Sequence, residues 1–252
     1  MRSLTILVLS IFLAGCATVY NPATGRDEVI FISTASEITI GDNAASQISQ
    51  KYKLSDNRKD LDRLERIGQK VAAASDRQDL EYKFYIIEDE NVNAFTIPGG
   101  HVYVFRGLYD VLDDDELAAV MGHEIGHVAA RHIVKRLQAQ LGFQALSTIA
   151  LIAYTSNQDD KKKKQAGYAA YAGATAFNLV MLGYSRSDEY QADELAVKYA
   201  SKAGYDPDGM ARSLKKLKDR QKKGFPVPYI LRSHPYLDER IKRLKPIAEK
   251  ES

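Results

Sequence analysis

Two histidines and a glutamate stand at a spacing that metal-dependent hydrolases use. The stretch His123-Glu124-Ile125-Gly126-His127 has the pattern H-E-x-x-H. If this stretch is helical, His123 and His127 lie on one face of the helix, and their imidazoles can share one metal ion. Zinc suits two imidazoles and a carboxylate, and it lowers the pKa of a bound water towards about 7. Glu124 would accept the proton of that water and pass it to a leaving amine, so the expected chemistry is amide hydrolysis.

A catalytic zinc needs a third protein ligand. His132 follows His127 by five residues rather than six, and Ala130 stands where the metzincin pattern has glycine, so His132 is expected to be structural. Glu189 and Asp193 stand four residues apart, which places them on one face of an expected helix. Glu189 is therefore predicted to be the third ligand. Asp193 is predicted to accept a hydrogen bond from the ring N–H of a zinc-bound histidine.

The elements that must position these residues follow from the spacing of apolar side chains. Apolar residues recur at intervals of three and four in Ser36–Tyr52 and Asp60–Ala74, which predicts two amphipathic helices. Three strands of a small antiparallel sheet are predicted at Leu80–Ile87, Ala94–Ile97 and His101–Phe105. The fold class expected from the whole chain is α+β, mostly helical with this one small sheet.

The second half of the chain is predicted to be mainly helical. Asp113, Asp114 and Asp115 suit the N-terminus of a helix that carries the H-E-x-x-H motif and runs to about Gln140. The more apolar segment Leu141–Tyr184 is expected to be a buried hairpin or one that lies against a bilayer, rather than a membrane span. Further helices are predicted at Ser187–Lys202, Pro207–Lys222 and Asp238–Lys245, the last of which ends before Pro246.

Composition excludes several classes of function. With 252 residues, 45% of them hydrophobic, the chain can bury a core, which excludes disorder as its main state. The 35 basic and 33 acidic side chains leave a net charge of +2, so a dedicated nucleic-acid binder is not expected. The single cysteine excludes a disulfide framework and cysteine-ligated metal sites, so a metal must be held by histidine and carboxylate.

The single cysteine, Cys16, stands at the end of a predicted secretory signal. A basic start is followed by the apolar run Leu4–Leu13, which is too short to span a bilayer comfortably. Leu13-Ala14-Gly15-Cys16 resembles the bacterial lipobox, which implies cleavage before Cys16 and lipidation of its thiol. Ala17, rather than an aspartate, favours the outer membrane by resemblance to bacterial lipoproteins. The expected organisation is a signal peptide at 1–15, a lipidated tether at 16–35 and a metallopeptidase domain at 36–252.

Four motifs in the same order give the chain its resemblance to a known family. H-E-x-G-H is followed by S-R-x-x-E-x-x-A-D and preceded by Asn93-Ala94-Phe95 and Pro98-Gly99-Gly100. This combination resembles the zinc metallopeptidase family of HtpX, the CAAX prenyl endoprotease and the periplasmic proteases BepA and LoiP. The match covers roughly residues 33–244. The chain is most similar to the short lipoprotein members such as LoiP, because it has neither the clear transmembrane helices of HtpX nor the C-terminal repeat domain of BepA.

The resemblance implies a gluzincin fold and one Zn²⁺ per chain. It implies that His123, His127 and Glu189 are the zinc ligands and that Glu124 is the catalytic base. Asn93-Ala94-Phe95 matches the edge strand that binds substrate by strand addition in the family, although an ordinary strand is the alternative. The implied activity is endopeptidase cleavage of unfolded or misassembled proteins of the bacterial cell envelope, by an enzyme anchored to the outer membrane through Cys16 and facing the periplasm.

The C-terminal part carries one more element of the family. Ser233-His234-Pro235, followed by Arg240, matches its pattern S-H-P-x-x-x-x-R. His234 would donate a hydrogen bond to the oxyanion of the tetrahedral intermediate, and Arg240 would support the ligands without binding the metal. In the periplasmic relatives the histidine is also proposed to ligate zinc and keep the enzyme latent. A latent or chaperone-like module that binds clients with a blocked zinc site therefore stays open as the alternative.

Overall fold

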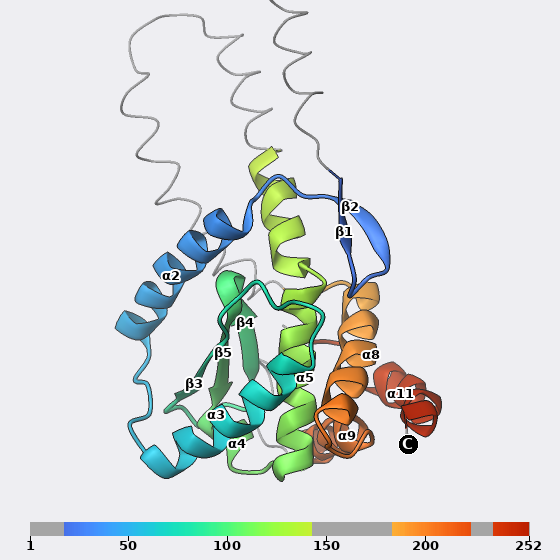
Figure 1. Ribbon diagram of the computed structural model, residues 1–252. Coiled ribbons are helices and arrows are strands. Elements are labelled where there is room, and N and C mark those ends of the chain that lie inside the picture. Colours follow the sequence, from blue (N-terminus) through green and yellow to red (C-terminus); the bar gives the residue numbers. More distant parts are fainter. Residues whose placement is uncertain (1–17, 143–182, 223–233, 252) are drawn as a thin grey trace, which may run out of the picture.

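A three-stranded sheet and the helices around it form the centre of the fold. The computed structural model describes residues 18–142, 183–222 and 234–251 (Figure 1). The strands lie in the order β3 (Lys83–Ile87), β5 (His101–Phe105) and β4 (Ala94–Ile97). The helices are α2 (Thr34–Lys51), α3 (Arg58–Ala73), α4 (Arg106–Tyr109), α5 (Asp114–Ala129), α8 (Arg186–Lys202), α9 (Gly209–Lys222) and α11 (Leu237–Glu251). The α+β prediction is confirmed.

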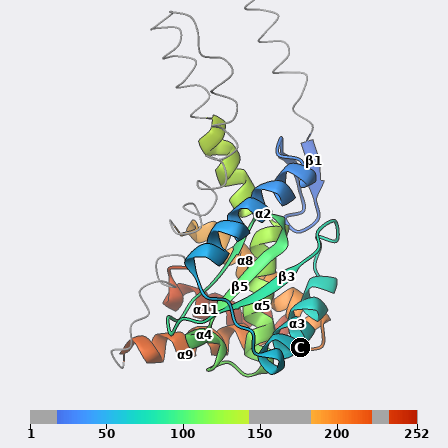
Figure 2. The same ribbon diagram turned by 90° about the vertical axis from the view of Figure 1, so that its left-hand side faces the viewer.

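Alternating side chains bury both faces of the sheet. Along β5, Val102 and Val104 join the core cluster formed with α3 and α5, whereas Tyr103 and Phe105 join the cluster formed with α2. In the second view α2 lies across the face of the sheet turned towards the viewer (Figure 2). On the other face, α5 lies between the sheet and α8 (Figure 1); α9 packs on α5, and α11 packs on α8 and α9.

The expected antiparallel arrangement is wrong for one of the two strand pairs. β4 pairs with β5 in antiparallel fashion, joined by the 3-10 turn η1 (Pro98–Gly100), but β3 pairs with β5 in parallel. The reason is the connection from β3 to β4, which passes over the position of the middle strand. β5 then fills that position, between β3 and β4. β4 is thus left at an edge of the sheet. Sequence periodicity marks strands but carries no information about this crossover.

The helix that carries the H-E-x-x-H motif ends earlier than expected. Its start is as predicted, because Asp113 and Glu116 form a reciprocal capping box. It ends at Ala129 rather than near Gln140, since Arg131 adopts a left-handed backbone conformation with φ 56°. A second helix follows at residues 132–142. The change of direction brings Val134 to a small cluster of buried apolar residues against the N-terminal segment.

The last helix is longer than expected. It continues through Pro246 to Glu251 instead of ending before the proline. The proline cannot bond to the carbonyl of Lys242, but both residues are exposed to water, and the buried Ala248 beyond them keeps the helix packed on the core.

The segment 16–35, expected to be a tether, is folded from Thr18 onwards. β1 (Thr18–Asn21) and β2 (Arg26–Val29) form an antiparallel hairpin. The Asn21 side chain donates a hydrogen bond to the carbonyl of Ala129, at the end of α5, at 3.1 Å. Turn residues in the sequence predict the reversal at 22–25 but not its docking on the domain.

No helix in the described ranges is long and apolar enough to cross a membrane. Most of the apolar segment Leu141–Tyr184 and the lipobox at Cys16 lie outside the described residues. The domain boundaries given above stay predictions.

Two glycines let α5 and α8 approach each other closely. A Cβ atom on Gly122 would lie 3.0 Å from the carbonyl oxygen of Ala196, and a Cβ on Gly126 would lie 3.2 Å from that of Ala192. Both distances are to backbone atoms, which cannot rotate away as a side chain can. The glycines are one turn apart on α5, and the alanines are one turn apart on α8. The small residues at this contact therefore set the separation of the two helices.

Replacing Gly126 by valine should separate α5 from α8. The larger side chain overpacks the contact, for which we expect a loss of about 1–3 kcal/mol in the free energy of unfolding. Gly142→Val is the matched control, because a Cβ at Gly142 meets no atom of the described residues within 4 Å. Urea unfolding of both variants tests this. A Gly126→Val midpoint equal to that of the control would contradict the role of the contact.

Candidate metal centre

The two histidines of the motif lie on the inner face of α5 and are buried. His123 is 3% and His127 1% exposed. Their Nε2 atoms are 3.1 Å apart, as expected of residues one helical turn apart. Burial lowers the pKa of His127 well below its ordinary value, although Glu189 opposes this shift. His127 is therefore a neutral imidazole, the form that binds metal ions.

Helix α8 brings a carboxylate to the same point. Ser185 and Asp188 form a capping box at its start, which fixes where the helix begins. Glu189, fully buried in the first turn, lies 3.6 Å from the Nε2 atoms of both His123 and His127. Burial alone would raise the pKa of Glu189, but the neighbouring positive groups hold it well below its ordinary value, so the side chain is a carboxylate.

A third imidazole completes the group from the segment just before α11. Nδ1 of His234 lies 3.2 Å from Nε2 of His123 and 3.0 Å from Oε1 of Glu189. One ligand atom from each of His123, His127, Glu189 and His234 lies within 4.8 Å of all the others. The negative charges of Glu189 and Glu124 raise the pKa of His234 in spite of its burial. The same charges attract a metal cation.

These four residues, which we call the donor cluster, fit a zinc ion. Ligand atoms at about 2.0–2.2 Å from a tetrahedral zinc are about 3.3–3.6 Å apart, and neighbouring donor atoms of the cluster are 3.0 to 3.6 Å apart. Imidazole nitrogen and carboxylate oxygen are donors that zinc accepts. Glu124 is not part of the cluster.

Asp193 and Arg240 hold the cluster from behind. Oδ1 of Asp193 lies 3.0 Å from Nδ1 of His123, so it can accept that N–H and leave Nε2 free for the cluster. Arg240 bonds to both oxygens of Asp193 at 2.7 and 2.8 Å, and its Nη1 lies 2.7 Å from Glu189. The structure thus places Asp193 and Arg240 beside His123 and Glu189 of the donor cluster; their supporting roles stay predictions.

His132, expected to be structural, contacts His127. The two Nδ1 atoms are 2.8 Å apart, and Nε2 of His132 lies 3.0 Å from Oε1 of Gln191. With Nε2 of His127 in the cluster, its Nδ1–H donates to His132, which in turn donates from Nε2 to Gln191. The five-residue spacing does not reveal this contact, because it depends on the break in the helix at Arg131.

Tyr184 is a second neighbour that the sequence does not mark. Its ring stacks on the imidazole of His127, with centroids 3.6 Å apart. Its phenol oxygen is buried and has no hydrogen-bond partner among the described residues, and burial raises its pKa well above the ordinary value. It follows a long apolar segment and belongs to no recognisable motif.

Glu124 lies beside the cluster, where an acid–base group would be needed. Its Oε1 is 3.5 Å from Nε2 of His234, and its Oε2 has no hydrogen-bond partner within the described part of the chain. The side chain is 1% exposed, and burial raises its pKa, against the opposing charges of His234 and His123. A buried carboxyl with a raised pKa can both accept and return a proton.

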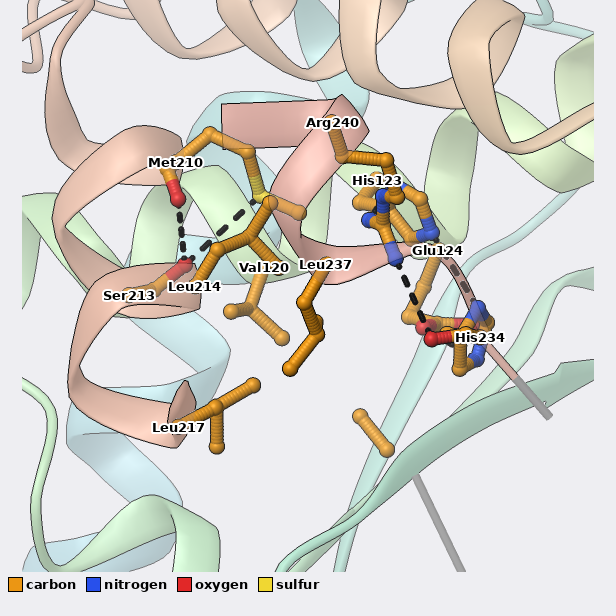
Figure 3. A pocket seen from close by; sticks show the side chains of 11 residues that line it. Val120, His123, Glu124, Met210, Ser213, Leu214, Leu217, His234, Leu237 and Arg240 are labelled. Carbon is orange, nitrogen blue, oxygen red and sulfur yellow. Dashed lines mark hydrogen bonds and ion pairs between the residues drawn. The ribbon is translucent and has the colours of Figure 1, made fainter. Parts of the chain in front are cut away.

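A small cavity of about 20 Å³ opens beside Glu124 and His234 (Figure 3). His123 and Arg240 line its polar side. Its apolar wall comes mainly from α5, α9 and α11, through Val120, Met210, Leu214, Leu217 and Leu237. Ala94 of β4 also lines it. The cavity therefore connects the acid–base group to an apolar lining and to the edge strand.

The expected substrate strand lies at the edge of the sheet. Ala94 and Phe95 belong to β4, and Asn93 directly precedes it. Ala94 points towards the cavity, whereas Phe95 points to the opposite face and stacks on Tyr103 at 5.0 Å. Among the described residues, β4 pairs with β5 alone, so its other side has no strand neighbour.

Comparison with known proteins places this arrangement in a family. The model of peptidase family M48 matches residues 58–248. The metalloprotease LoiP of Escherichia coli strain K12 is 31% identical over 187 residues, which are 74% of this chain and 71% of LoiP. The metalloprotease YcaL of the same strain is 28% identical over 229 residues, 90% of this chain and 82% of YcaL.

Longer proteins also match. The beta-barrel assembly-enhancing protease of Yersinia pestis is 26% identical over 222 residues, 87% of this chain and 45% of that protein. The chain spans less than half the length of the first curated relatives it matches. Because the M48 model covers three quarters of the sequence and every residue of the donor cluster, the chain belongs to peptidase family M48, whose named relatives LoiP and YcaL are metalloproteases.

Proposed function

We propose that the chain is a zinc-dependent endopeptidase. The observation that carries this proposal is the buried cluster of three imidazoles and one carboxylate with Glu124 beside it. His123, His127 and Glu189 would hold the ion, and a bound zinc supplies Lewis acidity and lowers the pKa of a water molecule. Membership of family M48 supports the same activity.

Glu124 is the proposed general base. Its unpartnered Oε2 can take a proton from water, and its raised pKa suits the return of that proton to the leaving amine. Arg240 and Asp193 would fix the orientation of His123 and Glu189 while the proton moves. Ser185 and the glycine contact between α5 and α8 set the position of Glu189 itself.

We propose that the substrates are extended, unfolded segments of envelope proteins. On the side away from β5, β4 has no strand neighbour among the described residues, and a substrate backbone that displaces what now buries this edge would pair with it; such pairing tolerates many sequences, and Ala94 joins this edge to the apolar cavity beside Glu124. Relatives bear the name beta-barrel assembly-enhancing protease, which supports a substrate among misassembled envelope proteins. The proposed location is the periplasmic face of the outer membrane, with a lipid anchor on Cys16.

His234 supports a latent state as a second candidate. Its Nδ1 lies 3.2 Å from Nε2 of His123 and 3.0 Å from Oε1 of Glu189, so His234 would compete with water for a zinc ion held by the other three residues. In this conformation the chain would bind a client along β4 without cutting it. Release of His234 from the cluster would then start hydrolysis.

The catalytic proposal is tested by Glu124→Gln and His127→Ala. Loss of the general base should lower kcat on casein by about 10²- to 10⁴-fold while the zinc content stays at one ion per chain. His127→Ala removes a ligand and should lose both the zinc and the activity. Undiminished casein cleavage by Glu124→Gln would refute the proposed mechanism.

Loss of His132 should weaken the binding of zinc without removing a ligand. Its contact with His127 orients that imidazole, and partners of this kind are worth about 10- to 100-fold in metal affinity. His101→Ala is the matched control, because His101 is equally buried but bonds to Asp42 and Tyr85, away from the cluster. Zinc titration against a competing chelator gives the two dissociation constants. If they are equal, His132 has no positioning role.

His234→Ala separates the two roles of that residue. If His234 blocks the fourth position, its removal should raise the rate of casein cleavage severalfold. If it stabilises an oxyanion, its removal should instead lower kcat by about 10²- to 10³-fold. The rate measured beside the unaltered chain at equal zinc occupancy decides between them, and the geometry leads us to expect the increase.

A further inference from the structure

The exposed apolar side chains are concentrated at the N-terminal end. Six large hydrophobic side chains in the described ranges are at least 36% exposed, and five of them lie between residues 19 and 38. These five are Val19, Tyr20, Val29, Phe31 and Ile38, and we call three of them, Tyr20, Val29 and Phe31, the N-terminal apolar surface. Tyr20 and Phe31 are each 60% exposed. Scattered exposure of apolar residues is ordinary, but a concentration on one short segment indicates a contact surface.

Three of these side chains share one face of the hairpin. Thr18 pairs with Val29 and Tyr20 pairs with Asp27, so Tyr20 and Val29 lie on the same face. Burial alternates along the continuation of β2, where Val29 and Phe31 are exposed while Ile30 is half-buried and Ile32 is buried. Tyr20, Val29 and Phe31 therefore point outwards together.

The opposite face of this segment is fixed to the domain. Ile32 packs with Val134 and Leu137 of the helix at 132–142. The Gln138 side chain accepts the backbone N–H groups of Phe31 and Ile32 at 2.8 and 3.0 Å and donates to the carbonyl of Val29 at 3.2 Å. These bonds hold the outward direction of the exposed side chains, so their exposure is a property of the fold.

The position of this surface along the chain identifies what covers it. Cys16 stands two residues before Thr18, a link that spans at most about 7 Å, and Tyr20 is within about 14 Å of Cys16 even in a fully extended chain. An anchor at Cys16 therefore holds the hairpin against the bilayer surface. A soluble partner or a second copy of the chain would have to displace that bilayer to reach the same side chains.

We propose that the N-terminal apolar surface lies in the interfacial layer of the membrane that holds the anchor. The inference rests on the lipid anchor proposed above. Tyrosine and phenylalanine side chains favour this layer, so their contact with it would fix how the anchored domain is oriented. The contact orients the domain, because Asn21 bonds to the end of α5 two residues beyond His127. The metal centre then lies on the membrane-facing half of α5.

Tryptophan fluorescence tests this contact, because the chain has no tryptophan of its own. Phe31→Trp places one indole on the proposed surface. Tyr205→Trp is the matched control, because Tyr205 lies far from the proposed surface. Its neighbour Asp206 bonds to Asp115 at the start of α5, and a helix of this length places that end about 22 Å from Ala129, where the hairpin docks. The full chain would be reconstituted into phosphatidylethanolamine–phosphatidylglycerol vesicles with and without brominated acyl chains, and flotation would report attachment.

The expected result is that both variants float with the vesicles and that brominated lipid quenches the emission of Phe31→Trp alone. Floating protein with neither indole quenched overturns the contact and leaves the anchor intact. A blue-shifted but unquenched Phe31→Trp also overturns it, because another protein surface then covers the site. If Cys16→Ser in the Phe31→Trp chain floats as well as its parent, the anchor fails and the inference with it. Casein cleavage by the same preparations reports on the peptidase separately.

Discussion

The close contact between α5 and α8 is the constraint on which the rest of the structure depends. α5 carries two imidazoles and a carboxyl, and α8 carries Glu189 and Asp193, so the donor cluster exists only at the separation that Gly122 and Gly126 allow. Side chains at these positions would meet backbone atoms of α8. The glycine inside the H-E-x-G-H pattern is therefore a packing requirement. It sets the position of Glu189 relative to His123 and His127.

The close approach of α5 and α8 buries two negative charges. Glu189 and Asp193 are buried as carboxylates one turn apart on α8, and a buried charge without a partner is costly. Arg240, itself 1% exposed, reaches both and comes from a different helix, α11. The docking of α11 thus depends on the acidic pair, and the same helix brings His234 to the cluster through the residues just before it. The docking of α11 therefore supplies both the positive charge of Arg240 and the fourth donor residue, His234.

Features set within one element could be predicted from the sequence, whereas those that depend on distant contacts could not. The spacing of His123 and His127, the cap at Asp113 and the three strands follow from local pattern. The parallel pairing of β3 with β5 depends on a crossover, and the contact of His132 with His127 depends on one left-handed residue, Arg131. Tyr184 reaches His127 from 57 positions away, without a motif.

The placement of the site suggests why a β edge, a buried cluster and an apolar N-terminal hairpin occur in one small domain. An unfolded envelope protein presents extended backbone and exposed apolar side chains. Such chains accumulate near the membrane into which they failed to fold. In the proposed function, β4 would offer backbone pairing, and the cavity behind Ala94 would offer an apolar contact next to Glu124. A domain held by its hairpin at the bilayer would meet such chains with its edge strand already oriented. A folded protein has neither a free strand nor the slack to enter the buried cluster, so the geometry itself would restrict cleavage to unfolded segments.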